Sequence, residues 1–466
     1  MSIDDLGIPN PEVLVVGGGN AAMTAALTAR SAGARVTVLE AAPAVFRGGN
    51  SRHTRNFRCQ HSKILGVMDG VYEEDEFLND LLEVTNGRTD KELALVTIRS
   101  SAASYHWMEA HGVHFQPALS GTLSLSRTNA FFLGGGKALL NALYARAEDM
   151  DIEIYYNAHV DHIEITDNKV QGVEVTMGAE IKRFAPKAVV VASGGFQADL
   201  EWLSRAWGQS AKNFLIRGTP YNRGAVLENL LEQGIVAVGD PAQCHAVAID
   251  GRSPKFDGGI VTRIDCVPFS VVVNCNGERF YDEGEDIWPK RYAIWGRLLA
   301  EQPNQKAFAI IDSKSKDLFM PSVFPTIETD SIDELAAKLN LPADKLNTTL
   351  ERFNSACQKG DFTPQELDGL KTTGIIPPKS NWARKINEPP FYGYPLGVGV
   401  TFTYLGLKVD AKARTEGKNG MMENLWAAGE IMAGSILRQG YLAGIGMTIG
   451  SVFGKIAGRE AANYVR

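Results

Sequence analysis

The strongest fold signal in the sequence is VLVVGGGNAA, residues 13–22. Its first four residues are apolar and predict a short buried strand, and the alanine-rich stretch that follows, to about Ser31, predicts a helix. Residues 35–40, RVTVLE, predict the next strand. Strand, glycine turn, helix and strand in this order are typical of a dinucleotide-binding unit, so we expect an α/β fold with a Rossmann-like domain.

The turn matches the pattern G-x-G-x-x-A, with Gly17, Gly19 and Ala22 at the three small positions. The first glycine permits a tight turn, the second lets a pyrophosphate approach the backbone, and Ala22 lets the helix pack closely on the strand. A diphosphate would lie at the helix N-terminus, where unpaired N–H groups favour an anion. Glu40 ends the second strand, where its carboxylate can accept hydrogen bonds from a ribose. Together these features indicate a dinucleotide site.

The glycine fingerprint occurs once, near the N-terminus, which favours FAD over a freely exchanging nicotinamide cofactor. A flavin that is retained through many turnovers needs contacts from distant segments, and several glycine-rich turns could supply them. Glu430 could bond the ribityl chain, and the helix that begins near Ala443 could direct its positive end at the flavin pyrimidine. The other expected cofactor contacts are Asn20, Ala21, Gly48, Gly49, Asn50, Ser51, Gly135, Gly136, Val160, Ser193, Gly194, Gly195, Gly429, Gly444 and Ile445.

The composition sets limits on the class of protein. The 466 residues are 44% hydrophobic, which suits two or three folded domains and excludes fibrous and disordered classes. A formal net charge of −7 argues against a general nucleic-acid binder. The five cysteines are widely spaced without a CxxC pair, so we expect reduced thiols and no metal site. The first ten residues resemble no targeting peptide and no run is typical of a membrane span, so we expect a cytoplasmic protein.

Two further regions have recognisable patterns. Residues 152–191 alternate apolar and polar residues between turn signals, which predicts a small antiparallel β-meander that returns to a buried strand. From about residue 240 the composition shifts to loops rich in Pro, Gly and Asp and then to two predicted helices. This stretch, to about residue 390, is a candidate for a separate lobe.

The chain contains the segments VLVVGGGNAAMTAA, RGGNSRHTRN, HWMEAHGVHF, RTNAFFLGGGKAL, VVVNCNGERFYDEGED and AAGEIMAG. Together they resemble the fumarate reductase/succinate dehydrogenase flavoprotein superfamily, and within it most closely the FAD-dependent tricarballylate dehydrogenases. The resemblance runs from about Pro11 to Ala462. It implies an FAD-binding domain built from both chain ends, an inserted α+β capping domain and an active site between them. The expected ranges are 1–240 and 396–466 for the FAD-binding domain and 241–395 for the capping, or substrate, domain.

The resemblance also implies site residues. The superfamily's proton-transferring arginine follows an N-x-x-G-x-R-F-x-[DN]-E motif, present here at residues 274–283, and the best match in register is Arg291. Its substrate-binding histidine stands in a Gln-x-His context, which is His245 here. These two are the expected catalytic residues. The expected substrate-binding residues are Thr262, Arg263, Thr403, Tyr404, Arg438 and Tyr441.

The chain departs from the family pattern at several positions. Its eight histidines end at His245, so the second active-site histidine is absent and Phe402 occupies its register. Arg263 stands where the family has a glutamate proton relay, with Asp265 two residues on, and the carboxylate-binding arginine is not in register, Arg438 being near. These changes argue against simple fumarate or succinate chemistry. The added positive charge would suit a third carboxylate, since arginine binds carboxylates in a bidentate manner.

A basic loop lies beside the GGNS turn. Its arginines would suit a solvated or phosphate-facing loop, or a site for carboxylates. His53 and His61 in this loop suggest a covalent histidyl flavin, but neither falls in the family's linkage register. The loop's arginines are Arg47, Arg52, Arg55 and Arg58, and Arg127 is a further candidate for the substrate site.

The expected reaction is oxidation of a C–C single bond next to carboxylates, such as tricarballylate to cis-aconitate, with hydride transfer to flavin N5. Arg291 would take the proton, and Lys290, Tyr292 and Tyr404 are alternative bases. Three other hypotheses stay open: a 3-ketosteroid-type dehydrogenase with a tyrosine base, a fumarate-type reductase, and a flavin-binding or assembly subunit without chemistry. The resemblance implies a separate membrane-bound iron–sulfur partner as electron acceptor, which would associate the protein with a membrane.

Overall fold

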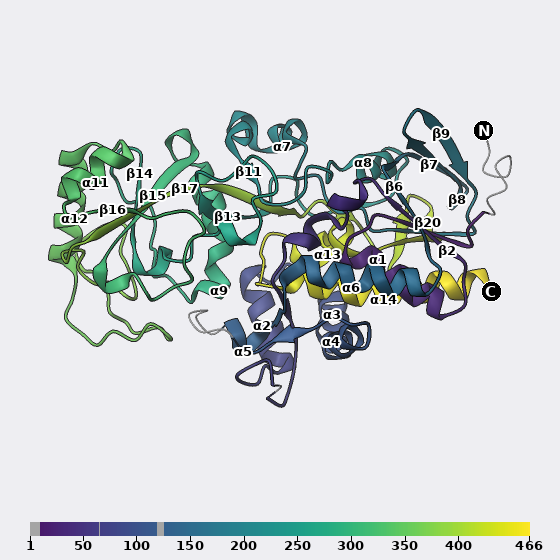
Figure 1. Ribbon diagram of the computed structural model, residues 1–466, viewed down its shortest axis with the longest axis horizontal. Coiled ribbons are helices and arrows are strands. Elements are labelled where there is room, and N and C mark those ends of the chain that lie inside the picture. The colour runs from purple at the N-terminus through teal and green to yellow at the C-terminus, as the bar shows by residue number, and fades with distance from the viewer. Residues whose placement is uncertain (1–9, 65, 119–124) are drawn as a thin grey trace.

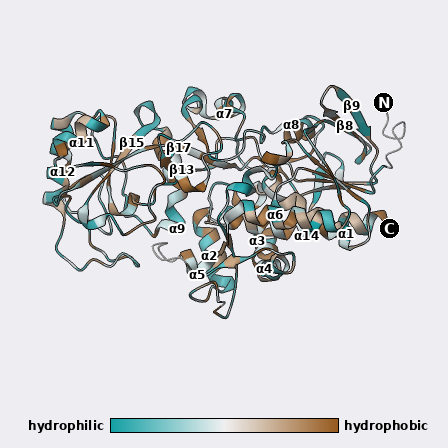
Figure 2. Ribbon diagram, in the orientation of Figure 1, coloured by the Kyte–Doolittle hydropathy of each residue, from teal (hydrophilic) through white to brown (hydrophobic). Residues whose placement is uncertain are grey.

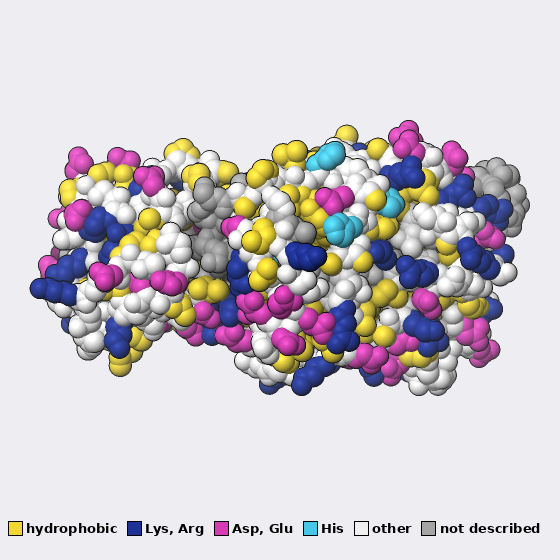
Figure 3. Space-filling model, turned by 90° about the horizontal axis from the view of Figure 1, so that it is seen from below, with side chains coloured by type: hydrophobic (Ala, Val, Ile, Leu, Met, Phe, Trp, Pro, Cys, Tyr) yellow, Lys and Arg dark blue, Asp and Glu magenta, His cyan; other side chains and the backbone are white. Residues whose placement is uncertain are grey.

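The computed structural model describes residues 10–64, 66–118 and 125–466. It is elongated, with a larger lobe that contains the C-terminal helix α14 (Ile445–Val465) and a smaller lobe at the other end that contains α11 (Ile332–Leu339) and α12 (Ala343–Ala356) (Figure 1). The strands inside both lobes carry mainly hydrophobic residues (Figure 2). On the face drawn in Figure 3, acidic and basic side chains are interspersed.

The larger lobe is built on a six-stranded sheet in the order β19-β20-β10-β1-β2-β6. Pairing is parallel except between β19 and β20, and Val13 of β1 lies between Ala188 and Val36 of its two neighbours. Every residue of β1 is buried, as expected for the central strand of a parallel sheet that is covered on both faces, and this explains its continuous apolar run. The strands are β1 (Val13–Val16), β2 (Val36–Glu40), β6 (Glu153–Tyr156), β10 (Ala188–Val191), β19 (Arg414–Gly417) and β20 (Gly420–Ala427).

Both ends of the chain contribute to this sheet, since β20 pairs with β10 in register with Val189 opposite Leu425. The expectation of an α/β fold built from both chain ends is therefore confirmed. The predicted meander is also present, as the antiparallel strands β7 (Ala158–Thr166), β8 (Lys169–Met177) and β9 (Glu180–Phe184). Asp167 and Asn168 join the first two strands at φ 50° and 59°, the left-handed conformation of a tight two-residue hairpin turn.

The first and last helices of the larger lobe pack backbone to backbone. Gly450, Gly454 and Gly458 recur every fourth residue on one face of α14, which faces α1 (Asn20–Ser31). A Cβ on Gly454 would lie 2.7 Å from the carbonyl oxygen of Ala21, and one on Gly458 would lie 2.3 Å from that of Ala25. Only glycine therefore permits this approach.

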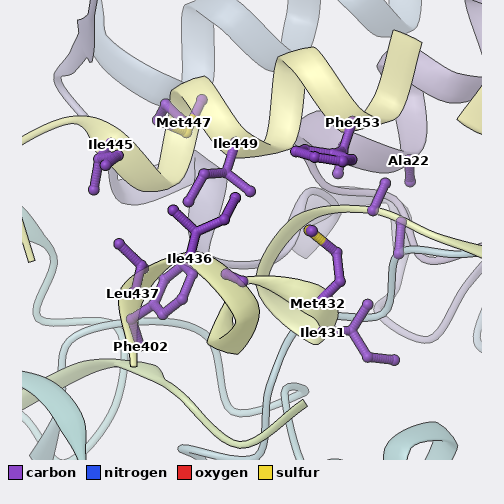
Figure 4. Packing of buried hydrophobic residues seen from close by; sticks show 14 of the residues in the cluster. Ala22, Phe402, Ile431, Met432, Ile436, Leu437, Ile445, Met447, Ile449 and Phe453 are labelled. Carbon is purple, nitrogen blue, oxygen red and sulfur yellow. The ribbon is translucent and has the colours of Figure 1, made fainter. Parts of the chain in front are cut away.

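The opposite face of α14 carries large apolar side chains. Ile449 and Phe453 point toward Ile436 and Met432 of the preceding segment (Figure 4). All four side chains are buried. This packing fixes the start of α14 relative to η10 (Gly429–Met432) and α13 (Gly434–Leu437).

The remaining elements of the larger lobe surround the sheet. Further helices are α2 (Glu74–Val84), α3 (Lys91–Arg99), α4 (Ser101–Ala110), α5 (Leu125–Thr128), α6 (Gly135–Asp149), α7 (Leu200–Trp207) and α8 (Ala225–Glu232). Small sheets pair β3 (Asn56–Arg58), β4 (Phe115–Gln116) and β5 (Asn129–Phe132), and β12 (Ala237–Val238) with β18 (Gly406–Leu407). In the described ranges, no helix combines the length and apolar character that crossing a membrane requires.

The smaller lobe has its own sheet and core, in agreement with an α+β capping domain. Its long strand β17 (Phe391–Thr403) pairs with four others, and a second apolar cluster packs beneath α11 and α12. The other strands are β11 (Leu215–Ile216), β13 (Cys244–Asp250), β14 (Val271–Asn274), β15 (Lys306–Asp312) and β16 (Ile327–Thr329), and the short helices are α9 (Trp288–Arg291) and α10 (Trp295–Ala300). The domain limits at 240 and 395 stay a prediction, and this sheet takes β11 from before the first limit and extends β17 past the second.

We expect Gly458→Ala to lower the free energy of unfolding by about 1–3 kcal/mol, the usual cost of overpacking, although alanine favours a helix by about 1 kcal/mol. Gly450→Ala is the matched control, because its nearest neighbour is the flexible side chain of Asn20, 3.2 Å away. Chemical unfolding of the purified variants measures the difference. Equal stability of the two variants would show that α1 and α14 are less closely packed than described.

Candidate active site

A cavity of about 950 Å³ lies between the two lobes. One end is lined by the glycine turn after β1, by Glu40 and by residues of the meander. The other end is lined by residues of the smaller lobe, among them Arg217, His245, Arg263 and Tyr292. The cavity therefore joins a dinucleotide-type end to an end with polar and charged side chains.

The glycine turn has the geometry that its sequence predicts. Gly17 adopts φ 112°, and a Cβ there would lie 2.4 Å from the carbonyl oxygen of Ala192. Buried Glu40 accepts hydrogen bonds from the backbone N–H groups of Ala42 (2.8 Å) and Gly48 (3.4 Å), and burial raises the pKa of its carboxyl group. Asn20 N donates to Ser51 Oγ over 3.0 Å. A close backbone approach, a helix N-terminus and a buried acid at one end of a large cavity fit a dinucleotide such as FAD.

Most of the expected cofactor contacts line this cavity. Those that do are Gly17, Gly19, Asn20, Ala21, Glu40, Gly49, Asn50, Ser51, Val160, Ser193, Gly194, Gly429, Glu430, Ala443 and Gly444. The others lie behind the lining. A Cβ on Gly136 would lie 2.0 Å from the carbonyl oxygen of Ser51, so α6 supports the loop from outside. Of the described residues, Ala22, Gly48, Gly135, Gly136, Gly195 and Ile445 are expected contacts that do not line the cavity.

Glu430 is a half-buried carboxyl group that lines the cavity. Its Oε1 accepts a hydrogen bond from Thr403 N (2.8 Å) and its Oε2 accepts one from Gln197 Nε2 (3.3 Å). Burial raises the pKa of Glu430 to about 7, although these donors favour the charged form. Thr403, expected to bind substrate, instead supports Glu430 and is not among the described lining residues.

Two buried arginines, Arg217 and Arg263, and the half-buried Arg55 lie near the other end of the cavity, with one carboxylate among them. Arg263 pairs with Asp265 through Nε (2.5 Å) and Nη2 (3.0 Å), and Arg55 Nη2 lies 3.8 Å from the same carboxylate. Arg217 has no ion-pair partner among the described residues; its Nη1 donates to Thr401 Oγ1 over 2.9 Å. Burial and the nearby Arg263 lower the pKa of Arg217 to about 9, so it is still mainly charged at neutral pH.

His245 and two tyrosines form an aromatic cluster beside these arginines. The ring of His245 stacks on that of Tyr441, with centroids 3.9 Å apart and planes at 4°. The Tyr292 hydroxyl lies 3.5 Å from His245 Nε2, and the Arg263 guanidinium lies 4.7 Å from the centroid of the Tyr292 ring. Burial, with Arg217 and Arg263, holds the pKa of His245 well below its ordinary value. The imidazole is therefore neutral at neutral pH.

The expected catalytic arginine lies elsewhere. Arg291 does not line the cavity among the described residues, and its Nη2 pairs with Glu285 Oε1 at 3.1 Å. Arg438, which adopts φ 52°, and the buried Tyr404 are likewise outside the described lining. Thr262 Oγ1 donates to the carbonyl oxygen of Gly259 over 2.8 Å and also lies outside it. The expected residues that the structure does bring together are His245, Arg263 and Tyr441.

The basic side chains of the loop beside the GGNS turn make different contacts. Arg47 donates to Asn141 Oδ1 (3.0 Å), and Arg58 is fully buried and donates to the Tyr72 hydroxyl (2.6 Å) and to the carbonyl oxygen of Ala443 (2.9 Å). Arg127 pairs with Glu76, away from the cavity. The two histidines of the loop also differ, since His53 lines the cavity and bonds Asp257 (2.7 Å), whereas both ring nitrogens of His61 bond backbone carbonyl groups.

Arg217 is the residue that the sequence interpretation missed. It follows β11, a strand of only two residues, and the surrounding sequence RGTP matches no pattern that indicates an anion site. Parallel pairing of β11 with Gly399 and Val400 of β17 places it at the cavity. Because the position of Arg217 depends on pairing between segments that are distant in the sequence, the residues next to it do not indicate that it lies at the cavity.

Comparison with known proteins identifies the cofactor. The model of a family described as FAD binding domain matches residues 12–447. NADH:acrylate oxidoreductase of Vibrio harveyi is 24% identical in an alignment that covers 97% of this chain and 50% of the relative, so the chain spans about half the length of that protein. The expectation of FAD as cofactor is confirmed.

Solved structures show the same fold. A flavocytochrome c3 fumarate reductase in an open conformation has a TM-score of 0.76 at 21% identity, covering 99% of this chain and 80% of the other. The 3-ketosteroid-Δ4-(5α)-dehydrogenase of Rhodococcus jostii RHA1, in complex with 4-androstene-3,17-dione, has a TM-score of 0.73 at 19% identity, covering 97% and 96%. These matches show that the chain shares the fold of these two proteins.

In the FAD-free protein, Glu430→Gln should become more stable relative to the parent as pH rises from about 4.5 to about 7. A raised pKa means that the folded parent holds the proton more tightly than the unfolded chain, so the parent loses stability as the carboxyl group ionises. The difference should grow by roughly 3 kcal/mol across this window. Chemical unfolding at several pH values measures it, and a difference that does not change with pH would contradict the assignment.

Proposed function

The chain belongs to the FAD-binding domain family, and we propose that it is an FAD-dependent oxidoreductase that oxidises a C–C single bond next to carboxylates. The observation that carries the proposal is Arg217, which lines the cavity, is 3% exposed and has no ion-pair partner among the described residues. A buried cation without a counter-ion destabilises the protein, and the carboxylate of a substrate would supply the missing negative charge. The relative named for acrylate, a carboxylate, supports this class of substrate.

The charge count favours a substrate with more than one carboxylate. Among the described residues, Asp265 pairs with Arg55 and Arg263 and Arg217 has no ion pair, so three arginines and one carboxylate leave an excess of two positive charges near this end of the cavity. Each charge-assisted hydrogen bond to a carboxylate contributes about 1.5–3 kcal/mol. A di- or tricarboxylate such as tricarballylate, which would be oxidised to cis-aconitate, is the substrate class that we propose.

The proton acceptor that we propose is Tyr292 together with His245. Tyr292 was an alternative base on sequence grounds, and it lines the cavity, whereas its neighbour Arg291 is paired with Glu285. Burial raises the pKa of Tyr292, while Arg263, Arg217, Arg58 and Arg55 lower it. The neutral imidazole, 3.5 Å from the hydroxyl, can take its proton as the hydroxyl takes one from the substrate carbon.

The residues of the cavity would also orient the substrate. When bound, FAD supplies the acceptor for the hydride that leaves the neighbouring carbon. Arg217 and Arg263 would hold the carboxylates and stabilise the negative charge that develops as the α-proton is removed. Phe402 and Tyr441 line the same part of the cavity and would exclude water from it.

The electrons would pass to a separate acceptor protein. The five cysteines are all unpaired and occupy separate places, so the chain itself offers no cysteine cluster for an iron–sulfur centre. An iron–sulfur protein at a membrane stays the proposed partner, on the resemblance alone, with the chain itself in the cytoplasm.

A second candidate is a 3-ketosteroid-type dehydrogenase. The stacked rings of His245 and Tyr441, with Phe402 beside them, form an aromatic wall that would suit an apolar substrate and a tyrosine base. The buried Arg217 and Arg263 favour a substrate with carboxylates. Inhibition by citrate but not by steroids would support the first candidate, and the reverse would support the second. Turnover of fumarate with a reduced dye would indicate a reductase.

Arg217→Gln should weaken binding of tricarballylate about ten- to hundredfold while FAD is retained, because a charged hydrogen bond to the anion is lost. Anaerobic titration of the FAD-loaded protein, followed by flavin absorbance, gives the Kd. Arg291→Gln is the matched control and should bind the anion as the parent does. Equal affinity of Arg217→Gln and the parent would refute the anion site.

Tyr292→Phe should lower the rate of flavin reduction by tricarballylate at least about a hundredfold, the usual effect of losing a general base, with little change in the Kd. Stopped-flow absorbance measures this rate. Arg291→Gln, assayed in parallel, should reduce its flavin at close to the parental rate. If Arg291→Gln is inactive and Tyr292→Phe is active, the proton acceptor is the arginine that the family register indicates.

A further inference from the structure

We infer that Asn50 is a positioning residue, which fixes Arg217 in place and couples the substrate end of the cavity to the loop at its cofactor end. The inference rests on the proposed role of Arg217. Asn50 belongs to the GGNS turn, and its position there makes it an expected cofactor contact. Its side chain, however, makes its hydrogen bonds within the protein.

Both polar groups of the Asn50 amide are used. Nδ2 donates to the carbonyl oxygen of Thr401 over 2.7 Å, and Oδ1 accepts from the backbone N–H of Thr219 over 3.0 Å. Thr401 belongs to β17 and Thr219 follows β11, so one side chain bridges two segments that are far apart in the sequence. An amide that bonds through both its nitrogen and its oxygen holds its two partners in a fixed relation.

Arg217 lies within the ring of contacts that Asn50 closes. Its backbone N–H donates to the carbonyl oxygen of Val400 (2.9 Å), and its Nη1 donates to Thr401 Oγ1 (2.9 Å). Thr401 is thus held by Asn50 through its carbonyl oxygen and holds Arg217 through its hydroxyl. On the other side, Thr219 is only two residues from Arg217. Asn50 therefore restrains both the backbone after Arg217 and the hydroxyl that orients its guanidinium.

Gly218 shows how closely Asn50 packs on this segment. A Cβ there would lie 1.8 Å from Asn50 Oδ1, and its three nearest neighbours are all atoms of the Asn50 amide. Gly218 is not among the glycines with positive φ, so its backbone does not need glycine for its conformation. The absence of a side chain at residue 218 makes room for Asn50 alone.

The next residue of the loop faces the cofactor turn. Ser51 Oγ accepts a hydrogen bond from Asn20 N at the start of α1, over 3.0 Å. Adjacent residues of η3 (Gly49–His53) therefore bind the glycine turn on one side and the Arg217 segment on the other. Because the loop itself lines the cavity, its position sets where Arg217 lies relative to the cofactor end.

The test is the affinity of the FAD-loaded full chain for malonate and tricarballylate, measured by the change in flavin absorbance. Asn50→Ala should weaken anion binding about ten- to hundredfold, as expected for losing one or two hydrogen bonds, and should leave FAD affinity within about threefold. Asn213→Ala is the matched control, since the exposed Asn213 precedes β11 and its side chain, among the described residues, bonds Gln305 over 2.7 Å. It should bind the anion as the parent does.

Gly218→Ala gives an independent measurement. Its Cβ would displace the Asn50 amide, so the single variant should weaken anion binding, and Asn50→Ala should remove the clash. The double variant should therefore bind no more weakly than Asn50→Ala alone, whereas full additivity would overturn the inference. If Asn50→Ala does not fold, Asn50→Asp keeps the volume, loses the donor to Thr401 and adds a carboxylate near Arg217, and should also weaken binding.

The outcomes separate this inference from the proposed function. Weaker binding in Arg217→Gln together with parental binding in Asn50→Ala overturns the positioning role and leaves the anion site intact. Parental binding in both variants overturns the anion site and the inference with it. Loss of FAD from Asn50→Ala in proportion to the loss of anion affinity would show that Asn50 is a cofactor contact, as its motif suggests, and would also overturn the inference.

Discussion

Helix α14 can lie against α1 only because Gly454 and Gly458 place no Cβ between the two backbones. This contact brings the last segment of the chain to the glycine turn near the first, so Ala443 and Gly444 line the same cavity as Gly17. The cofactor site thus does not exist until both chain ends are folded together. The smaller lobe is inserted between them, and its long strand β17 ends at the same cavity.

Burial of charge then determines what the cavity can bind. The structure satisfies Arg263 with Asp265, as a buried pair with good geometry requires, and leaves the Arg217 guanidinium with two neutral acceptors, the Thr401 hydroxyl and the carbonyl oxygen of Gly259. The same positive charges keep His245 neutral, because its protonation would add a further buried cation. An anion in the cavity would therefore act on both groups, stabilising Arg217 and making a proton on His245 less unfavourable.

Local patterns in the sequence predicted the larger lobe well. The apolar run of β1, the small residues of its turn and the hairpin at Asp167 each impose their structure within a few residues, and all three were found. The site was predicted less completely. Arg217 depends on the pairing of β11 with β17, which no local pattern records. Arg291 and Tyr292 show a second cause: successive residues of a helical turn point about 100° apart, so a register read from a motif does not say which of two neighbouring side chains faces the cavity.

Asn50 illustrates why a motif can indicate a place in the fold without indicating the partners of the side chain. The GGNS turn does line the cavity, because its backbone must pass close to the dinucleotide end. A side chain on such a loop can face either the cavity or the protein behind it, and the sequence is the same in both cases. The two cases differ in the hydrogen-bond partners of the side chain, which here are Thr401 and Thr219. Gly218 leaves the space that the Asn50 amide occupies. Gly218, which follows Arg217, is thus explained by Asn50, a residue more than 160 positions earlier in the chain. The contact between Asn50 and Gly218 connects the cofactor loop to the segment that carries Arg217.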